Sequence, residues 1–488
     1  MRVRVKWNCR PCGRGPGNTF NRITVEPRPL KFIADACAGT IVSGAADVEV
    51  RGITTDSRKV APGEVFIALS GDKFDGHDFV ADVTKRGAAA VVVEREVRVA
   101  DSACAVVKVG NTRVALGSLA AAYRGEFQIP LIAIGGSNGK TTTKELVAAV
   151  LRQKLNTLWS EASFNNDIGV PLTLLRLDRS HQAAVLEVGT NHPGELHPLV
   201  SMIQPRFGVI TSIGREHLEF FGDLQGVVRE EGVLAELSLA GGKLLLCGDG
   251  DFADALASRA QAQVVRVGFG KDCAWRASSE RSVKDGTAFR VTSPDGSFDG
   301  EYRTNLIGRH QVVNSLFAIV LGAELGLSRK LIQKGLAECQ PAKMRLQLYE
   351  QNGVRVIDDA YNANADSVIA ALRTLTELPC NGRTVAVLGD MAELGRHTES
   401  AHREVGRLAA ELGVGQLFAV GCMASVTAQA AREAGLLRVV EFLDVEAAAG
   451  AVKNFVRPGD LLLLKASRVA RLERISELLR GVEAAMKN

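Results

Sequence analysis

Short apolar runs alternate with amphipathic stretches over the middle of the chain, from residue 129 to about residue 340. The apolar runs, which we predict to be strands, are LIAIGG, AAVLEVG, FGVITSIG, KLLLCGDG and VVRVGFG. Stretches such as TTTKELVAAVLRQKL repeat apolar residues at helical spacing, and the helical segment VVNSLFAIVLGAELG closes the unit. Continuous apolar strands between helices are typical of a parallel sheet covered on both faces. We therefore predict a central parallel-sheet domain over residues 128–341.

Two further α/β units flank this one. Residues 29–127 contain the short β-like runs VEVRGITTDS, EVFIAL and AAAVVVE, separated by turns such as APGE. Residues 342–488 repeat the strand–helix alternation with VRVIDDA, RTVAVLGD, QLFAVGC, VVEFLD and DLLLLKAS, which predicts a doubly wound, Rossmann-like domain. No G-x-G-x-x-G occurs in this last unit, so a dinucleotide site is not supported. The prediction is an α/β protein of three domains.

The first 28 residues have a different pattern, in which Pro and Gly interrupt any periodicity. They contain one acid, Glu26, against Arg2, Arg4, Lys6, Arg10, Arg14, Arg22 and Arg28. A secretory signal needs an apolar core after its basic start, and this segment has none. We expect an unstructured extension or a mis-set translation start, with a basic transit-like segment as the alternative. Cys9 and Cys12 form a lone C-x-x-C, which favours reduced thiols over a zinc site.

Composition agrees with a multidomain enzyme and excludes several other classes. The chain has 488 residues, 46% of them hydrophobic, which at about 150 residues per domain suggests three packed cores. The 59 basic and 55 acidic residues give a net charge of +4, too even to indicate a nucleic acid or a lipid headgroup as partner. No apolar run approaches about 18 residues, so we expect no membrane span. Nine scattered cysteines do not suggest a disulfide framework, and we expect a cytoplasmic protein.

The sharpest chemical signal is a phosphate-binding loop in LIAIGGSNGKTTTKEL, residues 131–146, where a predicted strand runs into a predicted helix. Its loop residues are Gly136, Ser137, Asn138, Gly139, Lys140 and Thr141. Glycines let backbone N–H groups turn toward phosphates, and the helix N-terminus adds positive potential. Lys140 can reach the β- and γ-phosphates, and the Thr141 hydroxyl can hold Mg²⁺. Because Ile134 stands where the longer motif has its first glycine, the match is to the shorter G-x-x-G-K-T form. We predict that the chain binds a nucleoside triphosphate.

Polar residues follow the neighbouring predicted strands. Glu187 ends the run AAVLE, where a carboxylate beside a phosphate-binding loop is placed to bind magnesium. The run FGVITSIG leads to His217, which would otherwise be a surface or a satisfied core histidine; its position after a neighbouring strand favours the site. Asn165 and Asn166, in SFNNDIGVP, suit substrate recognition or a plain turn equally.

Taken together, these segments resemble a known family. GSNGKTT, FNNDIGVP, LEVGTNHPGE, GREHLEFFG, GRHQVVNS, DDAYNANADS and LGDMAELG occur in this order, as in the Mur ligases of peptidoglycan synthesis. The resemblance covers the chain from about residue 30 to the C-terminus. DDAYNANADS and LGDMAELG point to the dipeptide-adding member of the family.

The resemblance implies an ATP-dependent amide ligase that acts as a monomer on small molecules. Its substrates would be UDP-MurNAc-tripeptide and D-alanyl-D-alanine, joined through an acyl phosphate to give the UDP-linked pentapeptide. The small first domain would bind the UDP-substrate, and the central domain would be the P-loop ATPase. Such chemistry needs no enzyme nucleophile, and catalysis rests on positioning and charge stabilisation.

The resemblance also assigns roles to individual residues. Lys140 would stabilise the transferring phosphate, Thr141 and Glu187 would hold one Mg²⁺, and His217 would help bind a second. The resemblance assigns ATP binding to Thr142, His310 and Asn314, with His310 and Asn314 near the adenosine, and, from the C-terminal domain, to Arg345 and Asp359. It assigns the dipeptide side of the site to Tyr361, Asn362 and Asn364. It assigns binding of the UDP-sugar to Ser57 and Arg58. An ordinary helix start remains the alternative for His310 and Asn314, and a solvated turn for Ser57 and Arg58. Lys465-Ala466-Ser467-Arg468 resembles the family's K-G-S-R.

The chain departs from the family pattern at three positions. Glu231 stands where a carbamylated lysine usually supplies a carboxylate to Mg²⁺. We expect Glu231 to provide the negative charge directly, with a metal contact that passes through water because its stem is shorter. Met344 replaces a glycine beside Arg345, and Ala365 replaces a proline after Asn364; either could alter loop geometry without removing a chemical group.

Two other functions remain open at this point. Another amino-acid-adding Mur ligase, such as the diaminopimelate- or lysine-adding one, would differ in the amine that stimulates phosphate release. A P-loop NTPase of a different class would instead respond to a macromolecule, but that interpretation leaves the UDP-site resemblance and the third domain unexplained. The third residue of the acceptor peptide does not follow from the sequence.

Overall fold

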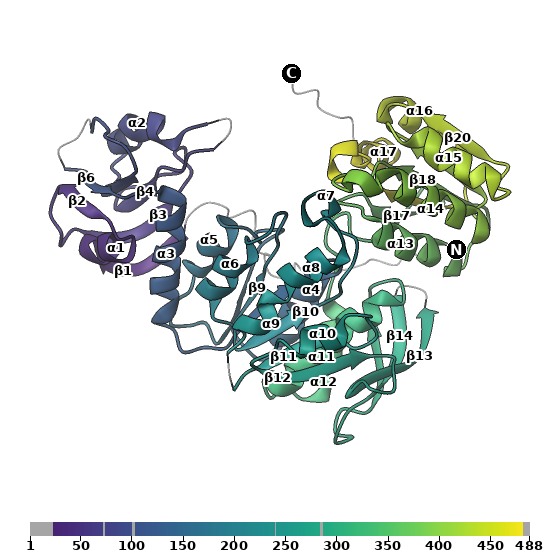
Figure 1. Ribbon diagram of the computed structural model, residues 1–488, viewed down its shortest axis with the longest axis horizontal. Coiled ribbons are helices and arrows are strands. Elements are labelled where there is room, and N and C mark those ends of the chain that lie inside the picture. The colour runs from purple at the N-terminus through teal and green to yellow at the C-terminus, as the bar shows by residue number, and fades with distance from the viewer. Residues whose placement is uncertain (1–22, 72–73, 100–102, 240, 284–285, 482–488) are drawn as a thin grey trace, which may run out of the picture. The chain divides into compact units, whose positions relative to one another are not determined.

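The computed structural model describes residues 23–71, 74–99, 103–239, 241–283 and 286–481. The described chain forms three sheets with helices packed on them (Figure 1). It divides into two compact units, one with residues up to 127 and residues 174–178, the other with residues 128–173 and 179 onward. The second unit contains both the central and the C-terminal sheet.

The first unit is built on a six-stranded sheet of order β1-β3-β4-β5-β6-β2. Its strands are β1 (Ile23–Pro29), β2 (Thr40–Ser43), β3 (Glu49–Thr54), β4 (Glu64–Ile67), β5 (Ala90–Val93) and β6 (Ala105–Lys108). Its helices are α1 (Leu30–Ala36), η1 (Gly76–Phe79), α2 (Val80–Lys85) and α3 (Thr112–Gly125). Strands β3 to β6 are parallel, whereas β1 and β2 close the two edges in antiparallel orientation.

Strand β1 corrects the expectation of an unstructured extension over residues 1–28. Residues 23–28 belong to this strand, and it pairs with β3 so that Ile23 lies opposite Ile53. Val25 is buried, and the Arg28 guanidinium forms ion pairs with Glu26 and with Glu126. The expectation failed because the basic charge of Arg28 is neutralised by acids, one of them far along the chain. Residues 1–22, including the Cys9–Cys12 pair, lie outside the described residues.

The central sheet has nine strands in the order β15-β14-β13-β12-β11-β10-β7-β9-β8. They are β7 (Leu131–Gly135), β8 (Thr157–Trp159), β9 (Ala183–Glu187), β10 (Phe207–Ile210), β11 (Lys243–Cys247), β12 (Gln263–Gly268), β13 (Trp275–Val283), β14 (Gly286–Thr292) and β15 (Gly300–Thr304). All neighbours from β8 to β13 pair in parallel, as predicted, but β13, β14 and β15 form an antiparallel extension that the apolar pattern did not predict.

Nine helices in the described chain connect or cover these strands. They are α4 (Lys140–Leu151), α5 (Gly169–Leu174), α6 (Leu196–Ile203), α7 (Leu218–Phe221), α8 (Leu224–Glu231), α9 (Val233–Leu237), α10 (Ala253–Ala257), α11 (His310–Glu324) and α12 (Arg329–Glu338). Helix α11 is apolar nearly all round and is buried between the sheet and its neighbours. Helix α4, which follows the phosphate-binding loop, packs against both α11 and α12. Helix α4 is therefore packed against two other helices of the same domain.

The C-terminal sheet has the order β16-β17-β21-β18-β19-β20. Its strands are β16 (Gln347–Gln351), β17 (Val354–Asp359), β18 (Thr384–Gly389), β19 (Gln416–Val420), β20 (Val439–Phe442) and β21 (Leu461–Lys465). Its helices are α13 (Ala365–Glu377), η2 (Gly395–His397), α14 (Thr398–Glu411), α15 (Ala424–Glu433), α16 (Val445–Phe455), η3 (Arg468–Ala470) and α17 (Glu473–Leu479). All neighbours except the antiparallel edge strand β16 pair in parallel.

Successive residues of the C-terminal strands face opposite sides of the sheet, as the pleat requires. On β17, Ile357 packs in the core that includes Leu372 of α13, whereas Val356 packs in the core that includes Val452 of α16. The sheet is thus covered on both faces, which explains why its strands are continuously apolar. In the described part of the chain, no helix combines the length and the apolarity that crossing a bilayer requires.

The contact between α12 and α4 generates a stability prediction. A Cβ atom added to Gly335 of α12 would lie 2.5 Å from the Cα of Val150 on α4. We expect Gly335→Ala to lower the free energy of unfolding by about 1–3 kcal/mol, because backbone must move to admit the methyl group. Urea denaturation followed by circular dichroism measures this change.

Gly450, within α16, is the matched control because nothing lies within 4 Å of the corresponding Cβ position. Gly450→Ala should leave stability unchanged or raise it by up to about 1 kcal/mol, through the better helix propensity of alanine. Equal effects of the two substitutions would show that the α12–α4 contact is not close enough to exclude a side chain.

Candidate active site

The phosphate-binding loop lies between β7 and α4 and depends on glycine at two positions. Gly136 and Gly139 have φ angles of 104° and 89°, in the left-handed region that side chains rarely adopt. A Cβ on Gly136 would lie 2.5 Å from the Thr211 hydroxyl oxygen. The loop is also joined to the segment after β10, because the Ser137 N–H donates to the carbonyl of Ser212 at 2.7 Å. The loop geometry is therefore fixed by the segment that follows the neighbouring strand.

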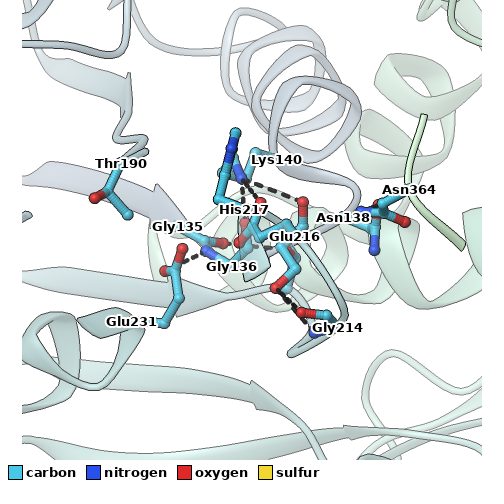
Figure 2. Close-up of polar contacts among 12 residues, drawn as sticks. Gly135, Gly136, Asn138, Lys140, Thr190, Gly214, Glu216, His217, Glu231 and Asn364 are labelled. Atoms are coloured by element: carbon cyan, nitrogen blue, oxygen red, sulfur yellow. Dashed lines mark hydrogen bonds and ion pairs between the residues drawn. The ribbon is translucent and has the colours of Figure 1, made fainter. Parts of the chain in front are cut away.

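The Lys140 ammonium is held inside this loop (Figure 2). Its Nζ donates to the carbonyls of Gly136 at 2.5 Å and Ser137 at 3.2 Å, and to Glu216 Oε2 at 3.2 Å. Burial alone would lower the pKa of Lys140, but the carboxylates of Glu216, Glu231 and Glu187 outweigh burial and raise it. Lys140 therefore carries a full positive charge at neutral pH.

Three buried carboxylates lie around this ammonium, at the ends of β9 and α8 and after β10. They belong to Glu187, Glu216 and Glu231. In each of them one buried oxygen has no hydrogen-bond partner among the described residues. Burial raises the pKa of Glu231 to about 8 and Glu216 adds to this, while Lys140 and the Gly136 N–H oppose it. Because Glu231 is then largely protonated at neutral pH, the negative charge of the cluster belongs to Glu187 and Glu216, beside the ammonium groups of Lys140 and Lys144. The oxygens without hydrogen bonds are the acceptors left for a further cation.

Glu231 contacts the phosphate-binding loop directly. Its Oε2 accepts a hydrogen bond of 2.6 Å from the Gly136 N–H, as Figure 2 shows. A Cβ on Gly135 would lie 2.9 Å from the same oxygen, so glycine is needed for this approach. The other oxygen, Oε1, has no hydrogen-bond partner in the described chain.

Thr141 and Glu187 lie together, as their predicted role requires. The Thr141 hydroxyl donates to Glu187 Oε1 at 3.2 Å, and the Asn165 amide donates to the same oxygen at 2.9 Å. Glu187 Oε2 is buried without a hydrogen bond. A hydroxyl and a carboxylate are the oxygen ligands that Mg²⁺ takes when water and phosphate complete its shell. These two residues therefore fit one Mg²⁺.

His217 and Glu231 do not join them in a protein cage. His217 has a φ of 46° and lies in the same cavity as Lys140, but its Nδ1 lies 2.6 Å from Glu393 Oε2. Among the described residues, no group of three or more His, Cys, Asp or Glu side chains is arranged to hold a metal ion. A second Mg²⁺ would thus need most of its ligands from substrates and water.

The predicted ATP residues of α11 lie beside the loop. A Cβ atom added to Gly139 would lie 2.7 Å from Asn314 Oδ1, so Asn314 approaches the loop closely. The Asn314 side-chain amide donates to Gln311 Oε1. His310 and Asn314 line a cavity of about 300 Å³ together with Thr142, Arg345 and Asp359. Burial lowers the pKa of His310 to about 4, although the Asp359 carboxylate opposes it. His310 is therefore neutral at physiological pH.

Asp359, at the end of β17, is fixed by two contacts. Its Oδ2 forms an ion pair of 2.7 Å with Lys465 Nζ, and its Oδ1 accepts from the Leu346 N–H at 3.0 Å. Lys465 Nζ also donates to the carbonyl of Asn362 at 2.8 Å. Burial lowers the pKa of Lys465, against the pull of Asp359. Lys465, which had no assigned role from the sequence, thus links two predicted site residues.

Arg345 and Tyr361 lie against one another at the same edge. The Arg345 guanidinium carbon is 4.1 Å from the centre of the Tyr361 ring, and the Tyr361 hydroxyl donates to Ser163 Oγ at 2.7 Å. Met344 and Leu346, on either side of Arg345, have φ angles of 57° and 48°. Met344 therefore adopts the backbone conformation that glycine would adopt without strain, which explains why glycine is usual at this position.

The amides of the two predicted asparagine segments have structural partners. Asn364 caps α13 through a reciprocal capping box with Ser367, and its Nδ2 donates to Asn138 Oδ1 at 3.0 Å (Figure 2). Asn166 Oδ1 accepts from the Gly169 N–H at 2.9 Å, so Asn166 forms a turn at the start of α5. Ala365, the departure from proline, is the first residue of α13 and is buried.

A cavity of about 340 Å³ connects many of these residues. It is lined mainly by polar side chains from the loop, from the ends of β9 and β10 and from the C-terminal sheet, including Lys140, Asn165, Glu187, His217, Tyr361 and Asn364.

Ser57 and Arg58, the residues predicted to bind the UDP-sugar, belong to the first unit. Arg58 is 83% exposed and donates to Asp56 through Nε and Nη2 at 2.9 Å each, as in a solvated turn.

Glu216, Lys144 and Glu393 are site residues to which the sequence analysis assigned no role. Lys144 is fully buried, one turn after Lys140 on α4, and its Nζ lies 3.9 Å from Glu187 Oε2. The four-residue spacing from Lys140 was a signal that both lysines share a helix face. Glu216 adjoins His217 in the sequence, whereas Glu393 is 176 residues from its partner and carried no local signal.

Comparison with known proteins identifies the family. Three family models match the chain: the Mur ligase family catalytic domain at residues 49–124, the Mur ligase middle domain at 134–322 and the Mur ligase glutamate ligase domain at 344–468. The chain belongs to the Mur ligase family.

Individual relatives point within the family. The UDP-N-acetylmuramoyl-tripeptide–D-alanyl-D-alanine ligase of Escherichia coli is 38% identical over 77% of this chain and 82% of its own length. The Bacillus subtilis protein of the same name is 33% identical over 92% of this chain and 97% of its own. MurF from Acinetobacter baumannii superposes with a TM-score of 0.86 at 32% identity, over 94% of this chain and all of that one.

The lowered pKa of His310 generates a pH prediction. In the unfolded chain a histidine titrates near pH 6.5, so the unfolded state takes up a proton first as the pH falls. The contribution of neutral His310 to stability is complete above about pH 6.5 and is lost as the pH falls toward about 4. We expect the wild-type urea midpoint to fall more steeply across this window than that of His310→Gln. Parallel declines would contradict the neutral state of His310 in the folded protein.

Proposed function

We propose that this chain is the ligase that adds D-alanyl-D-alanine to UDP-N-acetylmuramoyl-tripeptide with consumption of ATP. The activity named for its relatives is the basis for the substrates. The observation that carries the proposal is the shared cavity, in which the phosphate-binding loop and the C-terminal residues Tyr361, Asn362 and Asn364 face the same space. An amine held on the C-terminal side can there reach a carbonyl activated at the loop.

The reaction has two chemical steps. A carboxylate oxygen of the tripeptide attacks the γ-phosphorus of ATP, the bond to the β-phosphate oxygen breaks, and ADP and an acyl phosphate form. The amine of D-alanyl-D-alanine then attacks the acyl carbon, loses a proton, and expels phosphate as the amide forms. Both steps depend on alignment and on charge compensation, and neither requires a nucleophile from the protein.

The residues of the site supply this alignment and this charge compensation. The positively charged Lys140 lies within the loop and is placed to stabilise charge on the transferred phosphoryl group. Thr141 and Glu187 would hold Mg²⁺, which when bound offsets the negative charge of the phosphates. Arg345 and Asp359 line the cavity of about 300 Å³ together with His310 and Asn314. Asn165 orients Glu187 by hydrogen bonding.

Three finer points are part of the same proposal. His217 and Glu231, whose Oε1 has no hydrogen bond in the described chain, would help hold a second Mg²⁺, which would offset further phosphate charge. The UDP moiety would be bound by the first unit near Ser57 and Arg58. The enzyme would act as a monomer in the cytoplasm. The seven described cysteines are all free, which is usual for proteins of a reducing compartment.

The test is phosphate release from ATP and Mg²⁺ with UDP-MurNAc-tripeptide, measured with and without D-alanyl-D-alanine. We expect release to need both substrates and mass spectrometry to show the pentapeptide product. Lys140→Ala, the matched inactive control, should lower kcat by at least about 100-fold, because transition-state charge loses its compensation. Release stimulated by a single amino acid on a shorter UDP-peptide would move the chain to another member of the family, and release indifferent to all these substrates would refute the ligase.

The position of Glu231 generates a separate prediction. Glu231→Ala should lower kcat by about 10- to 100-fold, because the loop loses its contact at Gly136 and the cluster loses a carboxylate. Glu231→Lys should be active only with added bicarbonate, which can restore a carboxylate by carbamylation. Glu236→Gln, which alters an exposed carboxylate paired with Arg259, is the control and should match wild type. Unchanged activity of Glu231→Ala would refute the role of Glu231.

A further inference from the structure

We propose that Arg215 is a positioning residue for the reaction, because it ties the C-terminal helices to the segment that holds the phosphate-binding loop. This inference rests on the proposed function for its kinetic readout, but the contact itself can be tested without activity. Neither the sequence motifs nor the comparisons assign a role to Arg215.

Hydrogen bonds link the phosphate-binding loop to residues 212–214, the segment after β10. The Ser137 hydroxyl donates to the Gly214 carbonyl at 3.2 Å and accepts from the Gly214 N–H at 2.9 Å. The Asn138 N–H donates to Ser212 Oγ at 3.2 Å, and that hydroxyl donates in turn to the Asn138 carbonyl. Any displacement of residues 212–214 is therefore transmitted to Ser137 and Asn138.

Arg215 contacts two helices that pack on the C-terminal sheet. Its Nε and Nη2 donate to Asp366 Oδ1 at 2.9 and 2.6 Å, and its backbone N–H donates to Asp366 Oδ2 at 2.7 Å. Its Nη1 forms an ion pair of 2.5 Å with Glu404 of α14. Burial lowers the pKa of Arg215, but these carboxylates outweigh it and the guanidinium is firmly charged. One side chain thus joins α13 and α14 to the end of β10.

The backbone of Gly214 comes close to Asp366 at the same point. A Cβ on Gly214 would lie 2.8 Å from Asp366 Oδ2 and 3.1 Å from the Asn138 amide nitrogen. Asn138 also accepts from Asn364, two residues before Asp366. The loop, the β10 segment and the start of α13 therefore meet at Gly214, whose position is visible beside Glu216 in Figure 2.

The residues that follow Arg215 contact the groups proposed to take part in the reaction. Arg215 is followed directly by Glu216, which binds Lys140, and by His217, which binds Glu393 of the C-terminal part. When Arg215 holds α13 and α14, the predicted dipeptide residues before α13 are held at a fixed distance from Lys140. Loss of the contact lowers the fraction of molecules in which both substrates can be aligned, and kcat falls accordingly.

The experiment compares Arg215→Gln with wild type in the pentapeptide-forming assay and in solution scattering. We expect kcat to fall about tenfold, a typical size for coupling between sites, while KM for ATP changes less than about threefold. Arg215→Lys should recover part of the activity, since it keeps the charge but not the paired geometry. Small-angle X-ray scattering with a non-hydrolysable ATP analogue should show a larger radius of gyration for Arg215→Gln than for wild type.

Arg403→Gln is the matched control, because Arg403 lies on α14 and pairs only with Glu399 and Glu433 of the same sheet's helices among the described residues. It should match wild type in kcat and in scattering. The inference is overturned if Arg215→Gln keeps wild-type kcat and scattering, if Arg403→Gln loses as much, or if the loss in Arg215→Gln follows a large fall in melting temperature. If wild type itself forms no pentapeptide, the proposed function fails, and the scattering comparison alone decides the positioning role.

Discussion

The structure depends on holding one partly buried ammonium, that of Lys140, among carboxylates. Removing an ionised group from water costs several kcal/mol unless it is paired, and here Glu216 and two loop carbonyls pair it directly. The carboxylates of Glu187 and Glu231 face the same group and keep unpartnered oxygens. Lys144 Nζ, 3.9 Å from Glu187 Oε2, is a second cation beside the cluster, so a bound metal ion would satisfy the carboxylate oxygens that lack hydrogen bonds rather than an excess of negative charge. The site therefore keeps carboxylate oxygens available to a cation that accompanies a phosphate-containing ligand.

Parallel topology is what brings these charges together. Strands β10, β7 and β9 are neighbours in the central sheet, and the chain leaves all three at the same edge. Lys140 follows β7, Glu187 ends β9, and Glu216 follows β10. Each strand is continuously apolar, so each carboxyl end is fixed by a packed core rather than by the polar site itself. Charged side chains whose burial is unfavourable can thus be held in place by the hydrophobic packing of the strands that carry them.

The sequence could predict the parts of this arrangement that carry local signals. Apolar runs predicted the parallel strands, and G-x-x-G-K-T predicted the loop, because the residues that cause each feature are contiguous. Strands β13 to β15 were missed since their exposed face carries charged residues such as Arg276, Arg290 and Glu301, which interrupt the apolar pattern. Strand β1 was missed because Arg28 finds Glu126 far along the chain. The contacts of Glu231 with Gly136 and of His217 with Glu393 span 95 and 176 residues, and no local pattern indicates such pairs.

The segment after β10 shows how three consecutive residues can serve three different contacts. Arg215 reaches α13 and α14, Glu216 reaches Lys140, and His217 reaches Glu393. A regular strand or helix would direct side chains at positions i and i+2, or i and i+4, to a common face. This segment belongs to neither, and His217 takes a left-handed backbone conformation at the start of α7. That strain is offset by the ring's hydrogen bond and by its edge contact with Phe221. An irregular segment at the carboxyl end of a parallel strand thus allows one short peptide to join the nucleotide loop to the C-terminal sheet, a connection that regular secondary structure could not make in so few residues.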